Sequence, residues 1–190
     1  MSTMVEPKLT TTDELLAMPD DGIERWLING ELREGDVTRR NYKHSRVESK
    51  FDFKLREWLE AQPQPRGDVV VGEAGFMLRE DPAVTVGTDV AYIDADLASA
   101  CADADGIIHG VPVLVVEILS PSDEHDDVSE KIDAYLDCGV KIVWIVDPRF
   151  HTVTVYRPDR MPELFNASQT IDAEPHLPGF SAAVASFFSR

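Results

Sequence analysis

The sequence predicts an α/β domain, and three neighbouring segments carry that prediction. Residues 41–61 place apolar side chains at the spacing of a helix with one buried face. Residues 111–120 form a nearly continuous β-branched run, which is typical of a strand buried on both faces. A helical pattern over 122–139 then leads into a second apolar strand over 141–147. Together these segments indicate a sheet covered by helices.

Helix-capping residues, turn residues and alternating apolar residues predict the other helices and strands in the N-terminal half of the chain. They are a short helix capped at Thr11–Glu14 and ending near Pro19, a hairpin over 23–36 turning at Asn29-Gly30, and strands over 68–78 and 88–94 around a turn at Asp81-Pro82. The first strand of this pair follows the 41–61 helix, so the middle of the chain reads as helix, three strands, helix and strand.

The second half adds weaker signals. They predict an exposed loop over 95–110, an edge strand over 151–157, and a final helix that ends at Phe187-Phe188. We therefore expect one domain over 1–190, with a core over about 41–148, an N-terminal hairpin and a C-terminal β extension.

The charge balance limits the partners that the protein can bind. Lys and Arg number 18 against 35 Asp and Glu, which gives a net charge of −17. Such a charge disfavours salt-driven adhesion to DNA or anionic membranes. Any contact with nucleic acid must then come from a local basic strip or from bound metal.

Three further observations bear on the compartment. The chain has two cysteines, no basic segment followed by an apolar one at its start, and no apolar run longer than residues 111–119. Two thiols need no disulfide framework, and that run is too short to cross a bilayer. The expectation is a soluble, cytoplasmic protein without membrane contact.

Glu117 is the strongest chemical signal, because it interrupts an apolar strand. An ionised carboxylate in such a place is costly unless it is paired or holds a cation. The alternatives are a metal ligand, a buried ion pair with Arg or Lys, and a strand end that reaches solvent. Asp89, at the start of the strand expected over 88–94, is either a second ligand or a cap. If the two strands are neighbours, the carboxylates converge and suit Mg²⁺.

Basic residues supply the other candidates. Lys131 lies one helical turn from Val128 and Tyr135, so it is either a solvated lysine or one that reaches back to the strand end. A basic strip occupies the helix expected over 41–61 and the residues before it. Its members are Arg39, Arg40, Lys43, Arg46, Lys50, Lys54 and Arg56. It is either a solvated helix face or a track for phosphates.

His44 begins the same helix and is a candidate to point toward the site, although a lone histidine is more often structural. The remaining histidines lack metal-ligand spacing, and the sequence has no CxxC pair, P-loop, GxGxxG or GxSxG motif. Zinc, nucleotide-loop and serine-hydrolase sites therefore have no support.

A string of motifs in fixed order resembles the Uma family of putative restriction endonucleases, a branch of the PD-(D/E)XK nuclease superfamily. The string is LINGEL (27–32), His44, TDV (88–90), VLVVEILSPS (113–122), Lys131 with Tyr135, Gly139-Val140, WIVDP (144–148), then VTVYR and LPGF. It spans nearly the whole chain.

The resemblance implies a restriction-endonuclease-like core, αβββαβ, with a mixed central sheet, and cleavage of DNA that depends on Mg²⁺ or Mn²⁺. Asp89 and Glu117 match the motif acids, and the carbonyl of Ile118 would be a further metal ligand. The usual lysine position, two residues after the acid, is Leu119 here, which assigns the lysine role to Lys131.

Two departures from the family pattern affect these expectations. The PD dipeptide is Thr88-Asp89, which keeps the ligand. The family often has an acidic residue just before LINGEL, but this chain has Trp26 there, so Glu31 is the acid in this stretch. Glu31 and His44 are therefore the candidate accessory residues of the site.

The expected mechanism has Asp89 and Glu117 holding the metal while Lys131 assists the attacking water. The strip at Lys43, Arg46, Lys50 and Lys54 would hold the DNA backbone. A homodimer is expected by resemblance. The alternatives are a catalytically inactive module of the same fold that binds a partner, and a hydrolase of small phosphoesters.

Overall fold

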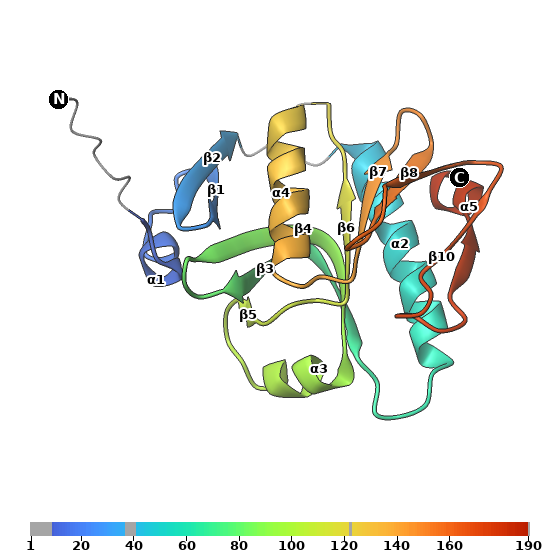
Figure 1. Ribbon diagram of the computed structural model, residues 1–190, viewed down its shortest axis with the longest axis horizontal. Helices are drawn as coiled ribbons and strands as arrows, with labels where there is room; N and C mark the ends of the chain where they lie inside the picture. Colours follow the sequence, from blue (N-terminus) through green and yellow to red (C-terminus); the bar gives the residue numbers. More distant parts are fainter. Residues whose placement is uncertain (1–8, 37–40, 122, 190) are drawn as a thin grey trace.

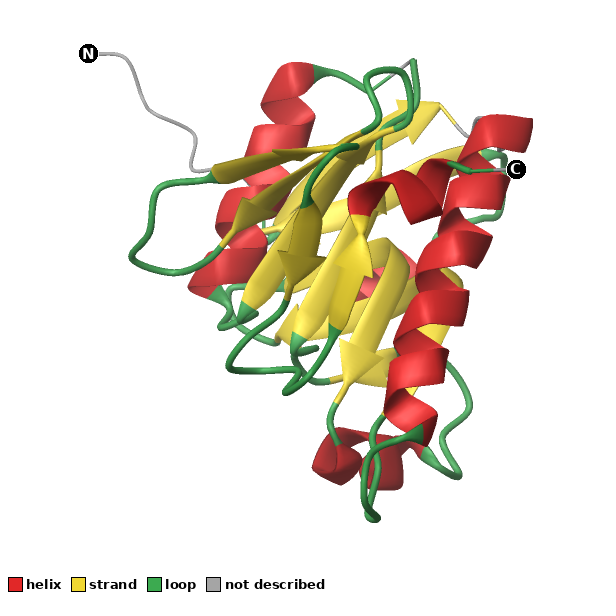
Figure 2. Cartoon of the chain, turned by 90° about the vertical axis from the view of Figure 1, so that its right-hand side faces the viewer, coloured by secondary structure: helices red, strands yellow, loops and turns green. Residues whose placement is uncertain are grey.

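The computed structural model describes residues 9–36, 41–121 and 123–189, in which a mixed sheet lies between helices (Figures 1 and 2). The helices are α1 (Thr12–Leu16), α2 (Tyr42–Glu60), α3 (Ala95–Cys101), α4 (His125–Asp137) and α5 (Val184–Phe188). The strands are β1 (Ile23–Ile28), β2 (Glu31–Asp36), β3 (Asp68–Arg79), β4 (Val84–Ile93), β5 (Ile108–His109), β6 (Leu114–Ile118), β7 (Ile142–Asp147), β8 (Thr152–Tyr156), β9 (Glu163–Asn166), β10 (Thr170–Asp172) and β11 (Ser181–Ala183).

The main sheet has the order β2-β1-β4-β6-β7-β8-β9, and β3 pairs with the other edge of β4. Strands β6 and β7 are parallel, as are β3 and β5, while the other pairs are antiparallel. The predicted αβββαβ core is present as α2, β3, β4, β6, α4 and β7. The expectation of a mixed central sheet is confirmed.

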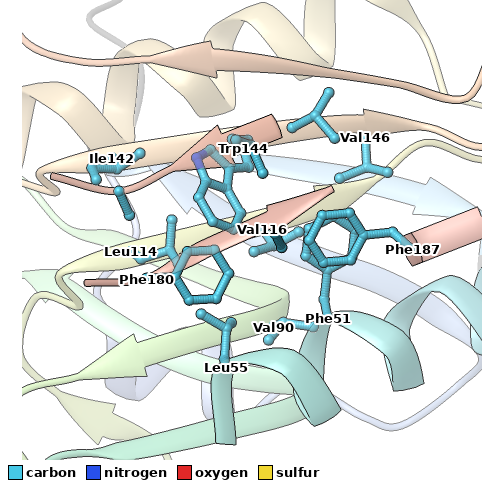
Figure 3. Close-up of a cluster of buried hydrophobic side chains, with 14 of the residues drawn as sticks. Phe51, Leu55, Val90, Leu114, Val116, Ile142, Trp144, Val146, Phe180 and Phe187 are labelled. Atoms are coloured by element: carbon cyan, nitrogen blue, oxygen red, sulfur yellow. The ribbon is translucent and has the colours of Figure 1, made fainter. Parts of the chain in front are cut away.

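Two hydrophobic cores hold the helices against the sheet. Helices α2 and α5 pack on one face, where the rings of Phe51 and Phe187 stack with centroids 3.9 Å apart (Figure 3). Trp144 from β7 lies in the same core, with its ring centroid 5.9 Å from that of Phe51. Helix α4 packs its residues Ile132 and Tyr135 into the second core. The elements that carry the candidate site are therefore anchored by packing on both sides of the sheet.

The N-terminal elements follow their sequence signals. Thr11 caps α1 in a box with Glu14, as predicted. Asn29 and Gly30 take positive φ angles of 53° and 78° in the hairpin between β1 and β2. Such a two-residue turn matches the twist of the paired strands, so the hairpin prediction is confirmed.

One edge of β4 is shared by two strands, which opens a fork in the sheet. β1 pairs with it at Leu27↔Thr85, whereas β6 pairs with it from Val90↔Val116 onward. Between these ladders, the described pairings leave residues 86–89 of this edge without a strand neighbour. The polar groups in the fork therefore bond to side chains, such as the Tyr135 hydroxyl at the Gly87 carbonyl, or to water.

The structure corrects three predicted elements. Strand β4 begins at Val84, four residues earlier than expected, so Asp89 lies inside a strand. The segment over 95–110 contains α3, capped by the Asp94 side chain on Leu97 N–H, and β5, instead of only a loop. Strand β8 is not an edge strand, because β9 pairs with it; its alternation reflects one buried face, not an open edge.

No helix within the described residues has both the length and the apolar character needed to cross a bilayer.

Candidate metal and nuclease site

The carboxylates of Asp89 and Glu117 meet at the fork of the sheet. Val90 pairs with Val116 at the end of the antiparallel ladder between β4 and β6, and Asp89 and Glu117 are the next residues beyond that pair. Both residues line the same cavity. The predicted convergence of these two strands is therefore present, although the sequence placed Asp89 at a strand end.

Asp89 is 2% exposed and is held from two directions. Its Oδ2 accepts a 2.7 Å hydrogen bond from the backbone N–H of Ile118, and it lies 3.2 Å from His44 Nε2. Asn41 caps α2 with bonds to the backbone N–H groups of Lys43 and His44, which fixes the turn that carries the imidazole. His44 thus lies against Asp89 from the α2 side of the sheet.

Glu117 is half-buried and accepts a short hydrogen bond from the hydroxyl of Tyr135, a buried residue of α4. The same hydroxyl lies 3.3 Å from the carbonyl oxygen of Gly87, in the open part of the β4 edge. Burial, and then the charge of Glu117, raise the pKa of Tyr135 well above its usual value. Tyr135 therefore stays a neutral donor that fixes one oxygen of Glu117.

A cavity of about 710 Å³ lies against both carboxylates, between the hairpin, β6 and α4. Its acidic lining residues are Glu24, Glu34, Glu73, Asp89, Glu117, Asp123, Glu124 and Asp127. Among the described lining residues, Lys131 is the only basic one. A cavity with this charge attracts cations and, without them, repels phosphate.

Lys131 lines the cavity. Its ammonium lies 4.9 Å from the ring centroid of Trp26, whose face provides a cation–π contact. The next residue toward the N-terminus, Glu130, holds Arg33 of β2 through two bonds of 2.9 and 2.7 Å. The hairpin and α4 are therefore joined next to Lys131 by the Arg33–Glu130 ion pair and the Lys131–Trp26 contact.

Other predicted residues lie away from the cavity. Glu31 is exposed and pairs with Arg33 at 2.9 Å, so the structure does not bring it to Asp89. The four basic residues of α2 assigned to nucleic acid lie on the helix that covers the opposite face of the sheet from α4. Arg46 bonds to the carbonyl of Phe188, and Lys54 pairs with Glu57. Arg39 and Arg40 lie outside the described residues.

Sequence reasoning missed Glu73, Glu24 and the role of Trp26. Glu24 and Trp26 lie on one face of β1, because side chains two apart share a face of a strand. Glu73 follows Gly72 within β3, and a glycine inside a strand signals a bulge. That glycine was the one available sign that a side chain is redirected there.

The donor set fits a hard divalent cation. Carboxylate oxygens are the ligands that Mg²⁺ and Mn²⁺ prefer, and Mg²⁺ takes one or two of them while keeping several waters. Ile118 borders the cavity while its side chain packs into the core on the α2 side, so its backbone faces this space. In the described chain, no three His, Cys, Asp or Glu residues are grouped tightly enough to hold a metal by themselves. These residues therefore suit a divalent cation that Asp89 and Glu117 bind and whose other ligands are mostly water.

The raised pKa of Tyr135 predicts sensitivity to alkali. An unfolded tyrosine loses its proton near pH 10, while folded Tyr135 keeps it, so the stability is complete below that pH and is lost above it. The loss approaches about 1.4 kcal/mol per pH unit above about pH 10. Urea unfolding of wild type and Tyr135→Phe from about pH 9 to about pH 11 measures it. Wild type should fall more steeply, and parallel curves would contradict the assignment.

Comparison with known proteins identifies the family. The model of the Uma2 family, "Putative restriction endonuclease", matches residues 12–185. The crystal structure of a putative nuclease belonging to DUF820 from Anabaena variabilis ATCC 29413 is 21% identical, with a TM-score of 0.75 over 94% of this chain and 97% of that chain. This likeness confirms the predicted nuclease-type fold. No curated protein matches the chain. The chain belongs to the Uma2 family of putative restriction endonucleases.

Proposed function

We propose that this chain is an endonuclease that hydrolyses phosphodiester bonds of DNA with Mg²⁺ or Mn²⁺. The observation that carries the proposal is that two carboxylates, Asp89 and Glu117, line one cavity together with Lys131. Membership of a restriction endonuclease family supports a hydrolase that acts on nucleic acid.

Each residue has a distinct task in this proposal. Asp89, Glu117 and the backbone of Ile118 would hold the cation, which when bound lowers the pKa of water and offsets charge on the phosphate. His44 orients Asp89, and Tyr135 orients Glu117. Lys131 supplies a positive charge at the cavity wall, where it stabilises the developing negative charge and orients the attacking water.

The basic residues of α2 would hold the DNA backbone. Arg46 and Lys54 already have partners in the fold, whereas Lys43 and Lys50 make no ion pair with any described residue. Lys43 directly precedes His44, the residue of α2 that contacts Asp89. Contact is then local and weak overall, because the net charge of −17 opposes it.

Nicking of supercoiled plasmid tests the proposal. Wild-type protein is incubated with Mg²⁺, Mn²⁺ or EDTA beside Asp89→Asn, with a chromogenic phosphodiester in parallel. We expect nicking by wild type with metal only, and a loss of at least about 100-fold in the variant, because even indirect support of a metal ligand is worth 10–100-fold. Equal background in all samples would reject the nuclease, and cleavage of the chromogenic substrate alone would indicate a small-phosphoester hydrolase.

A second candidate is a nuclease fold that binds a partner without cleaving DNA. The observation in its favour is the excess of acidic residues around the cavity, which repels a phosphate backbone until cations are bound. It predicts that Asp89→Asn changes cation binding or stability while wild type nicks no plasmid under any metal.

A further inference from the structure

Strand β3 carries a bulge directly across from Asp89. Val71 pairs with Val90 and Ala74 pairs with Thr88, so Gly72 and Glu73 together oppose the single residue Asp89. Bulges of this kind redirect a side chain, and they occur often beside active sites. The bulge is fixed from α2, because Glu48 accepts a 3.0 Å bond from the backbone N–H of Gly72.

The backbone at Glu73 is strained. Its φ is +60°, a left-handed conformation that glycine adopts freely and that a glutamate adopts at a cost. Such strain persists only where the surrounding structure imposes it. Here it places the Glu73 side chain on the wall of the cavity that contains Asp89 and Glu117.

Gly87 makes room for the carboxylate of Glu73. A Cβ atom at Gly87 would lie 2.8 Å from Glu73 Oε2, closer than atoms of this kind approach. The carbonyl oxygen of the same Gly87 lies 3.3 Å from the Tyr135 hydroxyl, which donates a hydrogen bond to Glu117. Glu73 lies beside Gly87, and Glu117 is linked to the same glycine through the Tyr135 hydroxyl, although the two glutamates come from strands on either side of β4.

We infer that Glu73 is a third carboxylate of the cation site, which acts through the hydration shell of the ion. This inference rests on the proposed function. Direct ligation is disfavoured because the described carboxylates are not grouped as a three-ligand cluster. A hydrated Mg²⁺ or Mn²⁺ between Asp89 and Glu117 has waters that need acceptors, and a carboxylate on the adjoining wall accepts from them. Glu73 is therefore a positioning residue for the ion, and the carboxylates that bind the ion directly remain those of Asp89 and Glu117.

Calorimetric titration of the full chain with Mn²⁺ tests the inference. We expect Glu73→Gln to weaken binding by about ten-fold or more, the usual cost of removing an outer partner of a metal site. Gly87→Ala should weaken it as well, because its new Cβ displaces the carboxylate without changing any charge. Glu124→Gln is the matched control, since Glu124 lines the same cavity but lies at the start of α4, where it makes no capping bond. Its Mn²⁺ affinity should equal that of wild type.

Two further measurements separate this role from a structural one. Glu73→Gly relieves the strain of the positive φ, which offsets the greater entropy of glycine in the unfolded chain, so its thermal unfolding midpoint should stay close to that of wild type while its Mn²⁺ affinity falls. Relaxation of water protons counts the waters bound directly to Mn²⁺. That number should be the same in Glu73→Gln and wild type, and one additional water in the variant would overturn the indirect role.

The outcomes distinguish this inference from the proposed function. If Asp89→Asn abolishes Mn²⁺ binding while Glu73→Gln and Gly87→Ala bind like wild type, Glu73 has no part in the site but the proposed function stands. If wild type itself binds no Mn²⁺, both are rejected. If Glu73→Gln and Glu124→Gln weaken binding equally, the effect is one of general charge and the inference fails.

Discussion

Glu117→Gln is expected to lower metal-dependent plasmid nicking by at least about 100-fold while leaving the fold intact, since outer partners alone are worth 10–100-fold and a ligand more. The amide keeps an oxygen that can accept the bond from Tyr135, so the side chain stays in place. What is lost is the negative charge that attracts the cation. Without metal, the variant should be as stable as wild type or more so, because it removes one of several like charges around the cavity.

Thermal unfolding with and without Mn²⁺ completes this test. A cation that binds only the folded state raises the unfolding midpoint of wild type, and Glu117→Gln should lose that rise. Glu60→Gln, which removes the same charge from the exposed end of α2, should keep both nicking and the rise. A clear loss of stability in Glu117→Gln, together with no protection of wild type by Mn²⁺, would show instead that Glu117 is a structural buried acid.

Phe51→Ala should cost about 3–5 kcal/mol of unfolding free energy, the largest stability effect that we expect from a single change. Phe51 is fully buried on α2, stacked on Phe187 at 3.9 Å and 5.9 Å from Trp144. Its removal leaves a cavity between α2, α5 and the sheet that these rigid neighbours cannot fill. Urea unfolding followed by circular dichroism measures the loss.

Phe53, two residues further along α2, is the matched control. Its side chain is 57% exposed, so Phe53→Ala should change the unfolding free energy by less than about 0.5 kcal/mol. Comparable losses in the two variants would contradict the assignment of Phe51 to the core. Because α2 also carries His44, a loosened helix in Phe51→Ala should weaken Mn²⁺ binding indirectly.

Local pattern was enough to predict the elements whose signals lie within a few residues. The helical spacing of α2, the apolar run of β6 and the glycine that follows α4 all depend on neighbours in sequence. Glu117 was also identifiable, because a carboxylate within an apolar strand is conspicuous without any knowledge of its partners. Helical spacing singled out Lys131, the family resemblance assigned it the lysine role, and the structure places it at the same cavity.

Features that depend on strand register were not predictable. Asp89 and Glu117 come to one cavity because β4 pairs with β6, which no local pattern determines. Glu73 reaches the cavity because of a bulge opposite Asp89. In the sequence, Tyr135 was one of several apolar residues on the buried face of a helix, so the bond of its hydroxyl to Glu117 was not foreseen. In each case the deciding neighbour is more than fifteen residues away in the chain.

The fork along β4 divides the cavity into a fixed wall and a variable one. Asp89 and Glu117 lie next to the ladder that pairs β4 with β6 from Val90↔Val116 onward, whereas the opposite wall is the hairpin, joined to β4 at a single described residue pair. A change of length or sequence in that hairpin alters the width and charge of the opening without moving the carboxylates. In the proposed nuclease, substrate preference can then diverge while the two carboxylates keep their places, and exchanging hairpins between related chains would transfer the preference together with the contacts of the hairpin to Lys131.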